Sequence, residues 1–183
     1  SNLRLSAVRD GLLRHAGVRA EIADADDADV ERTLGLLHER EYLRALAELG
    51  GDAEPVVMPQ FAPPGLEPDI PVQARLIAAA HEAVRASITA AARTLAGSPF
   101  TYAVCRPPGH HAGPAFHAGY CYLNNAAAAV LTLCGGGVES VGILALAQPY
   151  PNGTSSLLPR MPAPALHSLH AAPNTPLQPN PAQ

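Results

Sequence analysis

The sequence predicts an α/β domain built around a parallel sheet, and three observations support this prediction. Two short apolar runs, residues 100–105 and 141–147, have the composition of buried strands bounded by breakers. A helical segment, 122–133, lies between them. A further helix and strand, 155–158 and 165–169, continue the alternation. Strands that alternate with helices along a chain usually pair in parallel through right-handed crossovers.

The composition fits one domain with a single buried core. The chain has 183 residues, 48% of them apolar, and a formal net charge of −4, which argues against a nucleic-acid partner. Its longest strongly apolar run, Ala126–Leu133, is far shorter than the roughly 20 residues that cross a bilayer, so we expect no membrane partner. The three cysteines, Cys105, Cys121 and Cys134, form no CxxC pair and fit a reducing cytoplasm.

The first part of the chain predicts scaffold helices. Apolar residues recur near helical spacing from Leu3 to Leu13, which predicts an amphipathic helix that ends near Gly17. The acidic run DADDAD, residues 24–29, is predicted to be a solvated loop, because cation-binding loops need ordered spacing and a turn glycine. The segment HEREYLRAL predicts a second helix, in which His38 is a capping or packing residue.

A long loop and one strong helix precede the first predicted strand. Residues 50–71 contain six prolines and three glycines, which predicts a loop of the length that is usually functional or mobile. Residues 72–95 carry apolar side chains at spacings of three and four and lack glycine and proline. This pattern predicts a helix over the whole segment. The Gly-Ser-Pro sequence at residues 97–99 then ends it.

The segment densest in reactive side chains comes next and reads YAVCRPPGHHAGPAFHAGYCYLNN, residues 102–125. It leaves the first predicted strand at two prolines, presents two adjacent histidines and enters the next helix. In open parallel sheets, ligands bind in the loops beyond the carboxyl ends of the strands. Two loops meet that description, 106–118 and 148–154. We therefore expect the candidate site to lie between them.

The motif RPPGHHA, followed shortly by GYCYLNNAAAA, resembles the signature of the histone deacetylase superfamily, in particular its bacterial acetylpolyamine amidohydrolase branch. The resemblance extends weakly back through HEREYLRAL and forward through VGILALAQPYPNGT and LHSLHAAP, to about Pro173. It implies an open three-layer α/β fold with a mainly parallel sheet, of which only the N-terminal part is present. Residues 1–170 would form this partial domain, and the proline-rich tail, 171–183, is expected to be disordered.

The resemblance also implies a chemistry, which is metal-assisted hydrolysis of acyl-lysine or acylpolyamine amides. In this family a zinc ion, held by two aspartates and a histidine, polarises the carbonyl group and activates water. His110 and His111 stand where the family has its general base or acid and its electrostatic partner. Gly119 and Tyr120 match the stretch that lines the acyl tunnel. Asn152 matches the residue that hydrogen-bonds His111 and completes the candidate site.

The metal site is where the resemblance fails. Family members carry two aspartates separated by one residue, then an unspecified residue, a histidine pair and GNGT. This chain reads ALAQPYPNGT at residues 145–154, and VGIL before it and NGT within it fix the register. Ala147 and Pro149 therefore occupy the two ligand positions, and neither has an atom that coordinates zinc. Ala145 replaces the aspartate that would orient His110.

No other carboxylate in the later part of the sequence replaces these ligands. Beyond the long loop, the only carboxylates are Glu82 and Glu139, and the third ligand and the tyrosine that stabilises the transition state belong to the missing part of the family domain. His117, His167 and His170 could improvise a site with the histidine pair, but their apolar and proline-rich surroundings argue against it. We expect no bound cofactor.

Three hypotheses about function remain. A working zinc-dependent deacylase would need ligands that this chain lacks, so we favour an inactive relative. Such a relative could keep the pocket for an acyl-lysine or acylpolyamine ligand, or serve as a partner-binding module. A decayed or truncated gene product would have no selected function. Because the sheet would stop after about its first half, we expect an exposed edge strand near residues 165–169, which a homo- or hetero-oligomer could cover.

Overall fold

The computed structural model describes residues 2–15, 18–49, 54–67, 70–162 and 164–170. The proline-rich tail, for which disorder was predicted, lies outside the described residues, as does Gly17. Among the helices of the described residues, none is long and apolar enough to span a membrane.

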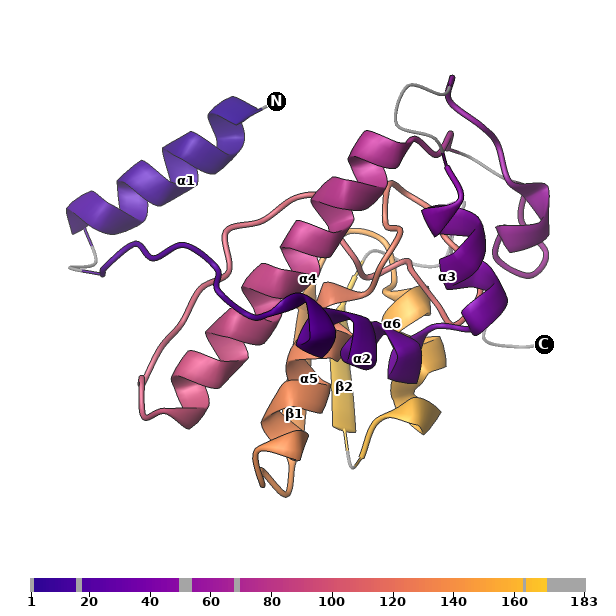
Figure 1. Cartoon of the computed structure of the whole chain (residues 1–183). Helices are drawn as coiled ribbons and strands as arrows, with labels where there is room; N and C mark the ends of the chain where they lie inside the picture. Colours follow the sequence, from indigo (N-terminus) through magenta and orange to yellow (C-terminus); the bar gives the residue numbers. More distant parts are fainter. Residues whose placement is uncertain (1, 16–17, 50–53, 68–69, 163, 171–183) are drawn as a thin grey trace.

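Two helices form the centre of the described fold. Helix α4 (Ala74–Leu95) packs along α5 (Asn125–Gly135) (Figure 1). It buries Ile77, Val84 and Ile88 on one face, and this periodicity confirms the helix predicted from the alanine-rich segment. Helix α5 confirms the next predicted helix and begins slightly later than expected.

The two described strands form a parallel pair. Strand β1 (Val141–Leu146) pairs with β2 (Pro164–Leu169). Helix α6 (Asn152–Leu157) and the 3-10 turn η2 (Leu158–Arg160) connect them. The parallel strand–helix–strand unit predicted from the sequence is therefore present.

The sheet has one covered face and one open face. Val141 and Ile143 pack against the hydrophobic core. On the other face Leu144, Leu146 and Leu169 are 64%, 69% and 68% exposed. Parallel sheets are normally covered on both faces, but the described residues supply helices to only one.

The segment 100–105, predicted as a buried strand, is not a strand. It pairs with no strand of the described residues, and Phe100 and Tyr102 are 63% and 57% exposed. A strand needs a neighbouring strand that completes its ladder of hydrogen bonds. Apolar composition predicts the extended shape but does not provide that neighbour.

The acidic run is not a loop throughout, which corrects the sequence prediction. Asp26 is the N-cap of α2 (Asp27–Leu37), and its carboxylate accepts a hydrogen bond from the Asp29 backbone N–H at 2.7 Å. Carboxylates at this end also interact favourably with the helix dipole. The run therefore starts a helix while most of its side chains stay in solvent.

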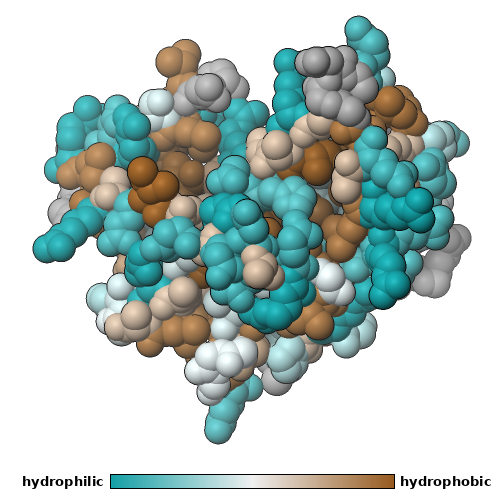
Figure 2. Space-filling view, viewed as in Figure 1, coloured by the Kyte–Doolittle hydropathy of each residue, from teal (hydrophilic) through white to brown (hydrophobic). Residues whose placement is uncertain are grey.

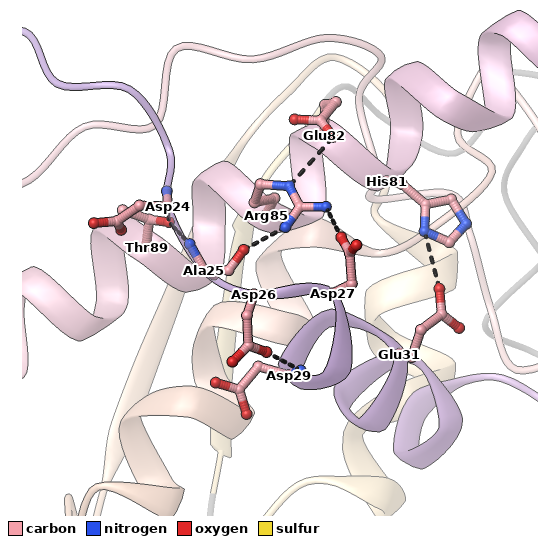
Figure 3. A network of polar contacts seen from close by, with 10 residues as sticks. All are labelled: Asp24, Ala25, Asp26, Asp27, Asp29, Glu31, His81, Glu82, Arg85 and Thr89. Carbon is pink, nitrogen blue, oxygen red and sulfur yellow. Dashed lines mark hydrogen bonds and ion pairs between the residues drawn. The ribbon is translucent and has the colours of Figure 1, made fainter.

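Figure 3 shows the hydrogen bonds and ion pairs that join the acidic run to α4. The Arg85 guanidinium donates to the Asp27 carboxylate at 2.5 Å and to the Ala25 carbonyl oxygen. One turn further along α4, the Thr89 hydroxyl accepts from the Asp24 and Ala25 N–H groups at 3.1 Å each. The acidic residues therefore dock α2 on α4.

The remaining N-terminal elements surround this centre. Helix α3 (Arg40–Ala47) confirms the helix predicted over HEREYLRAL. Helix α1 (Asn2–His15) stands apart from the body of the molecule (Figure 1). The described residues of the long proline-rich segment, 54–67 and 70–71, are mostly loop, as predicted, with one 3-10 turn, η1 (Pro59–Phe61). The face shown in Figure 2 mixes hydrophilic and apolar side chains, and apolar groups are visible both in hollows between polar ones and on protruding parts of the surface.

Candidate functional site

The two adjacent histidines lie in the loop that leads into α5, and their rings are in contact. The ring centroids of His110 and His111 are 4.0 Å apart, with the planes inclined by 60°. His111 is buried, and its Nδ1 atom lies 2.5 Å from Oδ1 of Asn152, the first residue of α6. Because a carbonyl oxygen only accepts, Nδ1 carries the proton. The contact between His111 and Asn152 predicted from the sequence is therefore present.

The first turn of α6 also fixes the backbone of the histidine pair. The Thr154 N–H donates to the His110 carbonyl oxygen at 3.0 Å. A Cβ atom on Gly153 would lie 2.5 Å from both the nitrogen and the oxygen of Ala112. Only glycine allows this close approach of two backbones. The NGT sequence thus contacts the histidine pair in three ways: Asn152 through its side chain, Gly153 through close backbone packing and Thr154 through its backbone N–H.

Electrostatics keep His110 neutral near pH 7. Burial, and to a smaller extent the neighbouring His111, lowers the pKa of His110 to about 4. Both effects disfavour the charged ring. An aspartate at residue 145 would raise the pKa of His110 and so oppose both effects, but Ala145 carries no charge. A general base works best when its pKa lies near the working pH, so His110 is poorly tuned for that role.

Gly119 and Tyr120, the predicted tunnel residues, form the tip of a tight turn. Both have positive φ, 54° and 62°. The Cys121 N–H donates to the Ala118 carbonyl at 2.8 Å and closes the turn. Two successive positive φ values are typical of a type I′ turn. A tyrosine in this left-handed region is uncommon, and here its side chain is 56% exposed.

Ala147 and Pro149 lie where the chain leaves β1. Ala147 lines a shallow depression of about 550 Å³ at the carboxyl ends of the two strands. The other lining residues are Leu146, Gln148, Ser168, Leu169 and His170. The depression occupies the position expected for a ligand site in a parallel sheet, but the histidine pair does not line it.

The described residues do not fit a zinc ion. In the described part of the chain, no group of three or more His, Cys, Asp or Glu residues is arranged to hold a metal. His167 lies in β2 opposite Leu144, and His170 packs its ring 5.1 Å from Tyr150. The improvised histidine site that the sequence left open is therefore not formed by these residues.

Three buried polar residues support the loop that carries the histidine pair, although no sequence pattern had assigned them a role in the site. They are His38, Asn124 and Thr154, which are 2%, 0% and 2% exposed. Asn124 was detectable, because an Asn before an alanine run is an N-cap signal, and its side chain accepts from the Ala127 N–H at 3.0 Å. For His38, no local pattern predicts contacts with residues so far along the chain.

The model of the histone deacetylase domain matches residues 1–181. The chain belongs to the histone deacetylase family. This confirms the resemblance inferred from RPPGHHA and GYCYLNN.

Two curated members illustrate how far the similarity reaches. This histone deacetylase family protein is 35% identical over 105 residues to acetylpolyamine amidohydrolase 1 of Pseudomonas aeruginosa, covering 57% of this chain and 30% of that protein. It is 49% identical over 55 residues to histone deacetylase 8 of Arabidopsis thaliana, covering 30% of this chain and 15% of that protein.

The fold is also shared with solved structures. The crystal structure of acetylpolyamine aminohydrolase from Burkholderia pseudomallei superposes with a TM-score of 0.75 at 24% identity. The match covers 93% of this chain and 55% of that one. The predicted fold class is thus confirmed, and the chain spans about half the length of this relative.

Proposed function

We propose that this chain is a non-hydrolytic member of the zinc-dependent deacetylase family, which keeps the histidine pair and has lost the metal site. The observation that carries the proposal is the pair of residues that follow β1. Ala147 and Pro149 stand at two positions where the family has metal ligands, and neither side chain has an atom with a lone pair. A carbonyl group bound beside His110 and His111 would therefore meet no Lewis acid from these positions.

The state of the histidines supports the same proposal. The pKa of His110 is lowered to about 4, so the ring is neutral at pH 7 and only weakly basic. His111 remains held by Asn152. The pair can still donate and accept hydrogen bonds, which suffices to bind a polar group, whereas amide hydrolysis needs an activated water and a stabilised oxyanion.

We propose that the retained ligand is an acyl-lysine or an acylpolyamine. The support is the turn at Gly119 and Tyr120, which presents an exposed aromatic ring, together with relatives named as acetylpolyamine amidohydrolases and histone deacetylases. We also propose a cytoplasmic location, which the three free thiols of Cys105, Cys121 and Cys134 support.

A second candidate function, self-association, is favoured by the open face of β1 and β2. We propose that a second copy of the chain covers this face. Leu144, Leu146 and Leu169 present a row of exposed apolar side chains, and Arg160 is the only charged residue after Glu139. Strands β1 and β2 carry no Asp, Glu, Lys or Arg on this face, where His167 lies beside Leu144, so two copies can face each other across a two-fold axis without repulsion between fixed charges. Sedimentation over a hundredfold range of concentration should give a dimer that Leu146→Arg dissociates, and a monomer at every concentration would refute it.

The main proposal is tested by metal content and turnover. The full chain, purified without chelator, should contain well under one zinc per chain by elemental analysis. It should leave a fluorogenic acetyl-lysine peptide and an acetylated polyamine intact, while binding of the polyamine should be detectable by calorimetry and weakened by His111→Ala. Stoichiometric zinc, or turnover that His111→Ala abolishes, would refute the loss of hydrolytic function. If the acetylated polyamine does not bind, the proposal that the chain retains a ligand pocket is refuted.

A further inference from the structure

The 113–124 loop, which carries the Gly119–Tyr120 turn, is closed at its neck by one distant side chain. The Nδ1 atom of His38 lies 2.7 Å from the Gly113 carbonyl oxygen, at the start of the loop. The Asn124 N–H donates to the His38 Nε2 atom at 3.1 Å, at the end of the loop. His38 is the C-cap residue of α2, so it reaches across 75 and 86 positions of sequence.

These two hydrogen bonds determine the protonation of the ring. A carbonyl oxygen only accepts, so Nδ1 must carry the proton, and a backbone N–H only donates, so Nε2 must keep its lone pair. The imidazole is therefore neutral, in a single tautomer, and both of its nitrogens are used. Burial agrees with this, because it lowers the pKa of His38 to about 4.

The neck is joined directly to the histidine pair. The Asn124 side-chain amide donates to the Ala112 carbonyl at 2.9 Å and to the Thr154 hydroxyl at 3.1 Å. Ala112 follows His111 in the chain, and the Thr154 N–H holds the His110 carbonyl. A set of hydrogen bonds thus runs from His38, through the buried Asn124 and Thr154, to the backbone of His110 and of Ala112. In such a network the loss of one member leaves its partners unsatisfied.

We propose that His38 is a positioning residue for the candidate site. By closing the neck of the 113–124 loop, it fixes both the histidine pair and the Gly119–Tyr120 turn. The inference concerns the geometry of the loop, so it does not depend on whether the site still binds or hydrolyses an acyl group.

The test compares His38→Phe, which fills the site but has no polar atoms, with His38→Gln, which carries both a donor and an acceptor. NMR of the full chain without ligand follows the imidazole nitrogen signals of His111 and the amide exchange of Cys121 in the turn and Val84 in α4. Loss of two hydrogen bonds of about 1 kcal/mol each corresponds to roughly 30-fold faster exchange. We expect His38→Phe to accelerate amide exchange at Cys121 by roughly 30-fold more than at Val84 and to shift the imidazole signals of His111. His38→Gln should reverse part of both effects.

The matched control is Thr89→Val, which keeps the shape of the side chain but removes two hydrogen bonds outside the 113–124 loop, those that the Thr89 hydroxyl accepts from the Asp24 and Ala25 N–H groups at 3.1 Å each. This loss should speed exchange at Cys121 and Val84 equally and leave the His111 signals in place. If His38→Phe behaves like Thr89→Val, His38 serves general packing only and the proposal is wrong. If His38→Phe does not fold, His38→Gln decides alone: selective loosening of the turn supports the proposal, and equal loosening of turn and α4 overturns it.

Discussion

Adding one methyl group at Gly153 should damage the candidate site, and the structure predicts by how much. The new Cβ atom would stand 2.5 Å from the backbone nitrogen and oxygen of Ala112, whereas ordinary contacts begin at 3.4 Å. Helix α6 or the histidine loop must therefore move by about 1 Å. Both are backbone segments held by hydrogen bonds, so neither can turn aside as a flexible side chain would. Overpacking of this kind costs about 1–3 kcal/mol.

A control at Gly35 separates this steric effect from helix propensity. Gly35 lies within α2, is exposed, and has nothing within 4 Å of its own missing Cβ. Alanine should stabilise the helix there by about 0.5–1 kcal/mol, because it lowers the entropy cost of folding. The same substitution, Gly→Ala inside a helix, is thus expected to have opposite signs at the two positions.

Urea unfolding followed by circular dichroism measures both variants. Gly153→Ala should lower the free energy of unfolding by about 1–3 kcal/mol, or the melting temperature by roughly 2–4 °C for each kcal/mol. It should also shift the NMR signals of the His111 ring, because Gly153 contacts the backbone beside it. Gly35→Ala should raise the stability and leave those signals unchanged. A Gly153→Ala protein that is as stable as the parent, with unshifted His111 signals, would refute the close-packing argument.

Three further predictions concern acid, the open sheet face and the metal site. Acid should weaken the fold between pH 6.5 and 4, because His38 and His110 bind a proton in the unfolded chain but resist it in the fold. The share of His38 is a loss of about 1.4 kcal/mol per pH unit and roughly 3 kcal/mol in all. Urea midpoints for the parent and His38→Gln measure this share, and equal slopes would contradict the assignment. At a concentration low enough to keep the chain monomeric, Leu146→Thr, on the open face, should change stability by less than about 0.5 kcal/mol, whereas Ile143→Thr, on the covered face, should cost about 1–2 kcal/mol. A reversed order would contradict the assignment of the two faces. Ala147→Asp combined with Pro149→His should create weak zinc binding without deacetylation, since a catalytic site needs three protein ligands; zinc titration and the acetyl-lysine assay check this, and turnover would show that other residues complete the site.

Much of the fold follows from local sequence pattern. The helix at 74–95 could be predicted because its buried face repeats every three or four residues, and this repeat records burial directly. The parallel strands could be predicted because two apolar segments flank a short helix. The candidate site could be recognised because RPPGHHA and NGT are contiguous motifs. The absence of ligands at Ala147 and Pro149 is likewise a matter of residue type alone.

Tertiary structure decided the features that depend on contacts between distant segments. Residues 100–105 have the composition of a strand but are not one, because a strand requires a neighbour that local pattern does not provide. The acidic run at 24–29 was predicted as a loop, and it starts a helix because Arg85 and Thr89 of α4 hold it in place. His38 closes a loop 75 residues away. In each case the physical reason is the same: side-chain periodicity records whether a residue is buried, whereas only the folded chain determines which groups it meets there.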